Sequence, residues 1–453
     1  MSGFLVFAHG IAERADLPIP QWLFGWAAAA VLIVSFVGLA ILWPTPRLER
    51  PGLRRVARIP GWVDVVCGAI GVALFGLVVY AGLAGTQTAT ANLAPTFVYV
   101  HFWIGMVVLS VLFGDVFRLF NPWRAVARAA GWVMGRLAPG STPDPLPYPE
   151  RLGRWPAVVA ILAFGWLELA YQSRDDPSTL AVLALAYALV QLAGMSFYGV
   201  EAWSARADGF GVLFNLFARL SPWERRDGVL HLRAPLSGVT SLPAAPGTVA
   251  LMCVVIGITT FDGFTQGKIW ADLAPDVEQW LLDLGFGLRT AVETTFTLGL
   301  LAAVGFVALV YWLGVAGMHT VGRGHGTREL ARSFAHTLVP IGFAYALAHY
   351  FSLLVFQGQA TGFLISDPLG KGSDLFGTAD AQIDYGFISA NGIWYVQVGA
   401  LILGHVGALI LAHDRALAIY EDVREATRSQ YWMLLVMIGF TSLGLWLLSA
   451  TNA

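Results

Sequence analysis

The stretch that decides the fold is the run from residue 61 to residue 84, which reads GWVDVVCGAIGVALFGLVVYAGLA. It contains one charged residue, Asp64, close to its start. A bilayer core about 30 Å thick is spanned by roughly 20 consecutive apolar helical residues. This run therefore predicts a transmembrane helix.

The same pattern recurs along the whole chain, each time bounded by charged residues, Pro or Gly. We predict ten membrane spans, at residues 21–43, 61–84, 95–118, 155–173, 178–199, 244–262, 291–316, 332–356, 393–413 and 431–449. The predicted fold is an all-α polytopic helix bundle. It forms a single integral membrane domain over residues 1–453.

The composition supports a lipid bilayer as the main partner. Hydrophobic residues make up 57% of the 453 residues and charged residues 12%, with a mean hydropathy of +0.66. Soluble domains carry about 25% charged residues. These values exclude a soluble enzyme, a disordered protein and a nucleic-acid binder. Cys67 and Cys253 both lie in apolar runs, so no disulfide framework is expected.

The distribution of Lys and Arg predicts the orientation. Five loops, 44–60, 119–154, 200–243, 317–332 and 414–430, with Arg118 at the start of the second, carry 22 of the 27 basic residues. All five lie on one side only if the chain crosses ten times. Because cytoplasmic loops are enriched in Lys and Arg, both termini are expected outside. Lys occurs only at positions 268 and 371, a bias typical of GC-rich bacterial genomes, so we predict a bacterial plasma membrane protein.

The N-terminal residues 1–8 are short and uncharged for a signal peptide. We interpret them as an outside tail. Residues 6–8, Val-Phe-Ala, also resemble the end of a signal peptide, and cleavage there would expose His9 as the amino-terminal residue.

Four loops outside the spans have recognisable patterns. The sequences around Asn121-Pro122-Trp123 and Ser221-Pro222-Trp223 are similar, and each predicts the start of an interfacial helix. Residues 263–290 predict an amphipathic helix on the outer surface. The long Gly-rich loop 357–392 is interpreted as either a lid or a solvated spacer.

Ionisable residues inside a membrane are costly and are therefore candidates for function. Five of them are expected within about 10 Å of the outer face, from the helical rise per residue: His101, Glu168, Asp262, Glu293 and His349. Of these, we predict His101, Glu168, Asp262 and His349 as metal ligands or as residues that orient them. Imidazole and carboxylate together suit Zn, Cu, Fe or Mn. The favoured hypothesis is thus a transition-metal site open to a small-molecule or metal-ion ligand from outside.

A second polar layer is expected near the cytoplasm, formed by Asp115, His336 and His413, with His405 between the layers. A b-type haem held between His336 and His413 is one alternative, because their depths agree. Another is a proton-coupled or metal-coupled transporter, with a relay of Asp115, His405, His349 and Glu168.

Four segments resemble one known family. They are His9–Pro20, His101–Arg124, Thr260–Phe264 and His336–Tyr350. In these segments the chain resembles actinobacterial multi-pass membrane proteins commonly labelled fenitrothion hydrolase. The resemblance covers most of the chain and implies hydrolysis of an organophosphorus ester. Such hydrolysis, where metal-assisted, needs a metal that activates water and polarises the phosphoryl oxygen, which the outer layer would hold.

The first testable prediction concerns orientation. Reporter fusions after Arg58 and Arg226 are expected to be cytoplasmic, and fusions after Asp276 and Asp374 to lie outside, because of the asymmetry in basic residues. One fusion on the opposite side would contradict the ten-span topology.

Overall fold

The computed structural model describes residues 21–49, 52–139, 144–321 and 324–450, and most of this chain is helical. The predicted all-α polytopic bundle is confirmed. The two interpretations of residues 1–9, as an outside tail or as a cleaved segment ending before His9, lie outside the described residues.

Nine helical segments of the described residues are long and apolar enough to cross a bilayer. They lie in α1 (Gln21–Leu42), α2 (Gly61–Ala84), Leu93–Phe113, α8 (Pro177–Tyr198), α12 (Thr248–Thr265), α14 (Leu288–Val321), Thr327–Leu364, α18 (Ala390–Ile419) and α19 (Val423–Ala450). Two of these are composite. Leu93–Phe113 consists of α3 (Leu93–Thr96), the π-helix η2 (Phe97–Gly105) and α4 (Met106–Phe113). Thr327–Leu364 consists of α15 (Thr327–Phe334), η3 (Ala335–Thr337), α16 (Leu338–Phe356), η4 (Gln357–Ala360) and α17 (Thr361–Leu364).

The fourth predicted span, which is missing from these nine, is present as a shorter apolar helix, α7 (Trp155–Leu169). Its 15 residues extend about 22 Å at the helical rise per residue, less than the thickness of the bilayer core. The prediction 155–173 was therefore four residues too long. The chain turns at Ala170–Asp176, where Asp176 caps α8 through the amide of Ser178.

Other boundaries also differ from the predictions. The third span ends at Phe113 instead of residue 118, because Gly114 adopts φ 86° and a separate helix α5 (Val116–Phe120) follows. The eighth extends beyond 332–356 at both ends, since short helical turns continue it.

The remaining elements are η1 (Ala89–Ala91), α6 (Pro122–Leu137), α9 (Val200–Arg206), α10 (Gly209–Ala218), α11 (Ser237–Thr240), α13 (Lys268–Asp283) and three strands, β1 (Arg54–Arg58), β2 (Trp223–Arg226) and β3 (Val229–Leu232).

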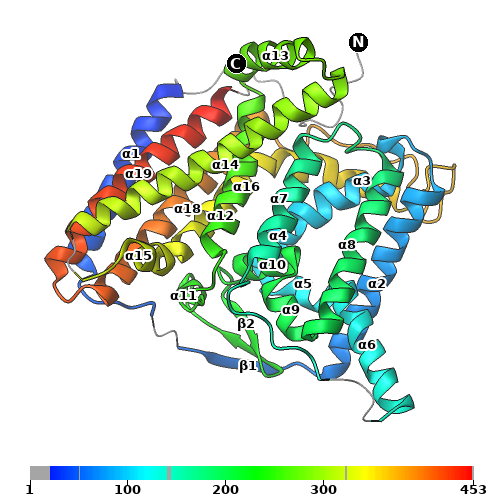
Figure 1. The fold of residues 1–453 in the computed structure, drawn as a ribbon, viewed down its shortest axis with the longest axis horizontal. Helices are drawn as coiled ribbons and strands as arrows, with labels where there is room; N and C mark the ends of the chain where they lie inside the picture. The colour runs from blue at the N-terminus through cyan, green and yellow to red at the C-terminus, as the bar shows by residue number, and fades with distance from the viewer. Residues whose placement is uncertain (1–20, 50–51, 140–143, 322–323, 451–453) are drawn as a thin grey trace.

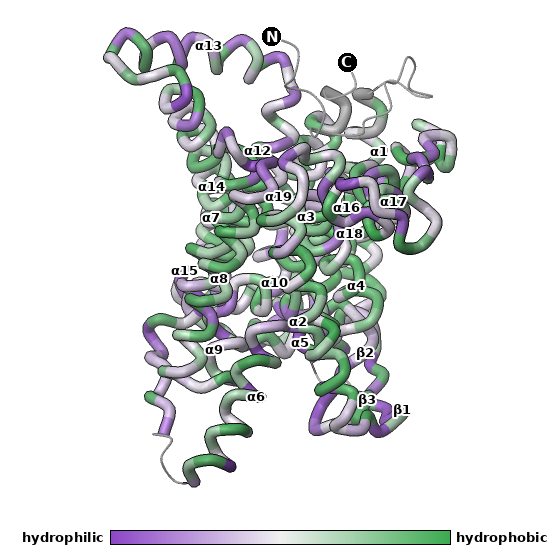
Figure 2. The backbone as a smooth tube through the Cα atoms, turned by 90° about the vertical axis from the view of Figure 1, so that its right-hand side faces the viewer, coloured by the Kyte–Doolittle hydropathy of each residue, from purple (hydrophilic) through white to green (hydrophobic). Residues whose placement is uncertain are grey.

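The helices run between two polar ends. Figure 1 shows the start of α1, the end of α19 and helix α13 at one end, and the sheet, α6, α11 and α15 at the other. The described parts of the five arginine-rich loops thus gather at one end, as the charge pattern predicts. Figure 2 shows that hydrophobic residues dominate the middle of the bundle and that most hydrophilic residues lie towards its two ends. We call the end with the sheet the arginine-rich end and the end with α13 the opposite end.

The two similar loops fold differently. The first starts α6, where the Asn121 side chain accepts a hydrogen bond from the Arg124 amide at 2.9 Å. The second was predicted to start a helix, and this was wrong, because Trp223–Arg226 form strand β2. Strand β3 lies between β2 and β1 in an antiparallel sheet, and the tight turn Asp227-Gly228 has positive φ at both residues.

Within residues 263–290, the predicted amphipathic helix is present as α13 (Lys268–Asp283), which lies across the end opposite the sheet (Figure 1). Its position on the outer side of the membrane stays a prediction. Its Trp270 packs against Phe261 of α12 and Phe296 of α14, with ring centroids 5.0 and 5.2 Å apart. Residues 365–389 of the long loop contain no helix or strand. Its function as a lid or a spacer stays open.

Glycines set the close packing of α2 against the arginine-rich end. A Cβ atom at Gly71 would lie 1.9 Å from the carbonyl oxygen of Phe120. A Cβ at Gly76, on the same helix, would meet nothing within 4 Å. Small residues at such positions let membrane helices approach closely.

This contrast gives the second prediction. Gly71→Leu should lower the thermal stability of the detergent-solubilised protein by ~1–3 kcal/mol, because the backbone of α5 cannot move away without repacking. Gly76→Leu is the matched control and should leave the melting temperature unchanged. Equal melting temperatures for the two variants would contradict the packing of α2 on α5.

Candidate functional site

A buried contact between a histidine and a carboxylate joins α12 and α16. The Nε2 atom of His349 lies 2.8 Å from Oδ2 of Asp262, and the two side chains are 11% and 8% exposed. Asp262 is in the last turn of α12, near the end opposite the sheet. These two residues are 87 positions apart in the sequence and were grouped because they were expected at a common depth. Their predicted proximity is confirmed.

Glu168 joins this contact from α7, which packs against α12. Its carboxylate interacts with Asp262, and the hydroxyl of Tyr350 and the indole N–H of Trp103 lie beside it. One oxygen of Glu168, the Tyr350 hydroxyl and Trp103 Nε1 are each buried without a hydrogen bond of standard geometry. Buried polar atoms are usually satisfied, and exceptions require an explanation. We call Trp103, Glu168, Asp262, His349 and Tyr350 the outer cluster.

His101 lies apart from the outer cluster. It belongs to the π-helix η2, and its Nε2 contacts the hydroxyl of Thr361 in α17. It also lines a large apolar cavity between α2, α7 and α8. Short π-helical segments occur often at functional sites, but this one directs His101 to a different neighbour from His349.

The structure therefore does not bring the four predicted metal ligands together. Among the residues that it describes, no group of three or more His, Cys, Asp or Glu side chains is placed to hold a metal ion. Cys67 and Cys253 are free thiols, as the sequence predicts. Binding of Zn, Cu, Fe or Mn stays a prediction.

Two of the four inner polar residues lie along the seam between α16 and α18. His405 of α18 is fully buried, and its ring centroid lies 6.0 Å from that of Tyr345, one turn of α16 before His349. His336, in η3, is 2% exposed. The Nε2 atom of each of these histidines is buried without a hydrogen bond of standard geometry, although the backbone of Leu411 lies beside the His336 ring. These two histidines are thus polar residues that lie between the outer cluster and the arginine-rich end.

The other two inner residues have structural partners. Both ring nitrogens of His413 are engaged at 3.0 Å, with Oε1 of Gln430 and the carbonyl of Trp43. No nitrogen of His413 is left for a haem iron unless these contacts break, so the geometry gives no support to the His336–His413 haem. Asp115 caps α5 and accepts a hydrogen bond from Asn215 at 2.8 Å, away from the α16–α18 seam.

Sequence reasoning missed a second buried carboxylate. Asp208, at the start of α10, is fully buried and accepts hydrogen bonds from Asn121, Trp123 and Tyr187 at 2.7–2.8 Å. Burial raises the pKa of this carboxyl group, although these donors oppose the rise. The Asn-Pro-Trp motif thus anchors α10 as well as starting α6.

No protein-family model, curated protein or solved structure matches this chain. The functional argument accordingly rests on the geometry of its own residues.

The third prediction compares two tyrosines on α16. The Tyr345 hydroxyl donates to the carbonyl of Phe440 at 2.6 Å, so Tyr345→Phe should destabilise the protein by about 0.6 kcal/mol, a typical value for a hydrogen bond within a membrane. Tyr350→Phe removes a hydroxyl that lies beside Glu168 without a hydrogen bond of standard geometry, and it should lower thermal stability less than Tyr345→Phe does. A larger loss for Tyr350→Phe would show that this hydroxyl serves the fold.

Proposed function

We propose that this protein is a proton-coupled membrane transporter in which the outer cluster takes up and releases the proton. The hydrogen bond between Asp262 and His349 at 2.8 Å, with Glu168 beside it, carries this proposal. Intramembrane carboxylates and histidines of this kind recur in proton relays.

The ability of the outer cluster to bind a proton follows from its ionisable groups and from their burial. Two carboxylates and one imidazole share a site that is shielded from water. Like charges at short range in a low dielectric are costly, so the cluster favours states in which the groups share a proton. Movement of one helix relative to another would then change which group holds it.

The α16–α18 seam supplies a route towards the arginine-rich end. His349 and His336 are 13 residues apart, about 20 Å along the helix axis. His405 lies between them beside Tyr345. The predicted relay is revised in one respect: Asp115 lies off this seam, whereas His336 lies on it.

A second candidate function, metal binding, rests on the same pair, because a carboxylate bonded to an imidazole is also how proteins orient a metal-binding His. It would allow the metal-assisted ester hydrolysis that the family resemblance implies. Elemental analysis of protein purified without chelator tests this candidate. About one transition metal per chain, lost in His349→Gln, would support it, and metal-free wild-type protein would oppose it.

The fourth prediction tests proton binding. In proteoliposomes on a solid-supported membrane, a pH jump should give a transient current, because a proton enters the outer cluster within the bilayer. Glu168→Gln and Asp262→Asn should each abolish this current. Asp276→Asn, which changes an exposed carboxylate on α13, should preserve it.

Three outcomes separate the possibilities. Equal currents in all variants would contradict the proposal. A sustained wild-type current would indicate a channel instead of a coupled transporter. A current removed by chelator and restored by metal would favour the metal site.

A further inference from the structure

A large apolar cavity opens between the helices of the half of the bundle that contains α7. Its volume is about 1520 Å³, and its walls come from α2, η2, α4, α7, α8 and α10. Most lining side chains are aliphatic or aromatic, for example Leu74, Met106, Leu183 and Phe210. The cavity reaches from Trp123 and Trp155, near the arginine-rich end, to His101 and Tyr171. It therefore extends through much of the membrane-spanning region.

A second, polar cavity of about 700 Å³ adjoins it at the arginine-rich end. We call it the arginine chamber. Phe117 lines both cavities, and sequence neighbours such as Arg154 and Trp155 line one cavity each. The Trp side chains at this border (Trp123, Trp155 and Trp203) are of the type enriched where hydrocarbon meets headgroups. The chamber thus lies at headgroup level and the apolar cavity at chain level.

Positive charge exceeds negative charge in the arginine chamber. Five guanidinium groups line it, from Arg118, Arg124, Arg154, Arg206 and Arg219, against three carboxylates, from Asp115, Glu150 and Glu201. Glu201 is already shared by Arg118 at 2.9 Å and Arg124 at 2.7 Å. Burial would raise the pKa of Glu201, but these two arginines hold it below its usual value. Asp115 is held by Asn215, and Glu150 is exposed.

The other three arginines of the chamber, Arg154, Arg206 and Arg219, form no ion pair with a carboxylate among the described residues. Arg206 is exposed and lies over the ring of Tyr148, which leaves Arg154 and Arg219 as the more enclosed pair. Arg154 is 6% exposed, donates to the Thr248 hydroxyl at 2.8 Å, and has a buried Nε without a partner. Burial and the charge of Arg219 lower the pKa of Arg154 to about 10.

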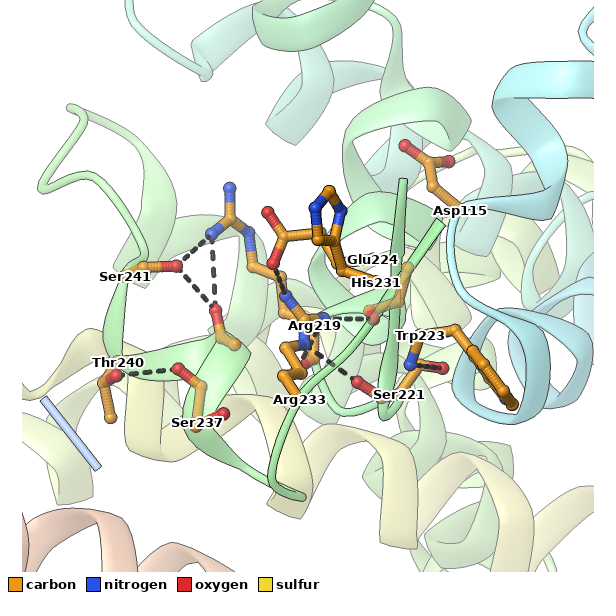
Figure 3. Close-up of polar contacts among 12 residues, drawn as sticks. Asp115, Arg219, Ser221, Trp223, Glu224, His231, Arg233, Ser237, Thr240 and Ser241 are labelled. Atoms are coloured by element: carbon orange, nitrogen blue, oxygen red, sulfur yellow. Dashed lines mark hydrogen bonds and ion pairs between the residues drawn. The ribbon is translucent and has the colours of Figure 1, made fainter. Parts of the chain in front are cut away.

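Figure 3 shows the surroundings of the second arginine. Arg219 donates to the Ser241 hydroxyl at 3.1 Å and the Gly238 carbonyl at 3.4 Å, and its Nε is buried without a partner. The nearby Glu224 bonds to Arg233 instead, at 2.7 Å. Burial and the charge of Arg233 lower the pKa of Arg219, and the charges of Glu224 and Asp115 oppose this shift only in part.

Arg154 is buried and Arg219 is half-buried, and each has a buried Nε atom without a hydrogen-bond partner. Neither forms an ion pair with a carboxylate of the chamber, and such guanidinium groups are unfavourable unless an anion completes them. Guanidinium groups match phosphate oxygens in geometry and bind them in pairs of hydrogen bonds. We propose that the two cavities together bind one anionic phospholipid, with its phosphate between Arg154 and Arg219 and its hydrocarbon chains in the apolar cavity.

The apolar cavity favours a lipid over a free phosphate ion. A free ion would need only the chamber and would leave a cavity of about 1520 Å³ beside it unexplained. Basic pockets between membrane helices at the cytoplasmic side are the places where proteins bind anionic headgroups. The site lies apart from the outer cluster, so it does not rest on proton coupling.

The fifth prediction is tested by melting curves of lipid-stripped, detergent-solubilised protein with added phosphatidylglycerol, phosphatidylcholine or inorganic phosphate. Phosphatidylglycerol should raise the melting temperature of the wild type most. In Arg154→Gln the phosphatidylglycerol concentration needed for half of this rise should increase about tenfold, as expected for loss of a charge-assisted pair of hydrogen bonds. Without lipid, Arg154→Gln should melt no lower than the wild type, because it removes an uncompensated buried charge.

Arg226→Gln is the matched control, since its side chain is 68% exposed in the nearby sheet, and it should respond to lipid as the wild type does. Arg219→Gln provides an independent second variant and should weaken the lipid response as Arg154→Gln does. Equal stabilisation by phosphatidylglycerol and phosphatidylcholine, or an unchanged response in both chamber variants, would overturn the proposal. Equal stabilisation by inorganic phosphate would assign the chamber to a free anion and overturn the lipid part.

Discussion

An ionised side chain is stable within the width of a bilayer only beside an opposite charge, hydrogen-bond donors or water. This constraint decides where the charged groups of the protein lie. The described arginines of the five basic loops gather at one end of the bundle. Deeper in the bundle, Asp262 and His349 are placed against one another, whereas His101 contacts the hydroxyl of Thr361. The remaining middle is apolar (Figure 2), and its helices pack through small residues and aromatic rings.

The spans were predictable because hydrophobicity is a property of local sequence. Each apolar stretch can be recognised without knowing which helices pack beside it. Errors arose where a distant segment decides the local structure. Trp223–Arg226 follow the same Ser/Asn-Pro-Trp pattern that starts α6, but form a strand because β3 pairs with both them and β1, more than 160 positions away. The π-helical turn around His101 likewise has no signature in hydropathy.

The sequence predicts how deep each candidate side chain lies in the membrane. It does not predict which neighbouring helix that side chain faces. Asp262 and His349 meet because α12 packs on α16. His101 was expected at a similar depth but contacts Thr361 instead, since η2 presents it to the apolar cavity. Trp103 gave no signal in the sequence, and Arg154 and Arg219 were read only as charges that set orientation. Their lack of carboxylate partners depends on which residues surround them, which no count along the chain reveals.

Helix α7 relates the two sites to each other. Its N-terminal cap is Arg154, in the arginine chamber, and Glu168, in the outer cluster, lies one residue before its end. The helix extends only about 22 Å, whereas α14, beside it, has 34 residues. When a helix is shorter than the thickness of the bilayer core, the polar residues at its two ends lie deeper than the two membrane surfaces. Arg154 and Glu168 are consequently buried by neighbouring helices instead of being hydrated, so each needs a chemical partner nearby. The short length of this one helix thus gives the protein two recessed polar sites, one at each end of a single crossing.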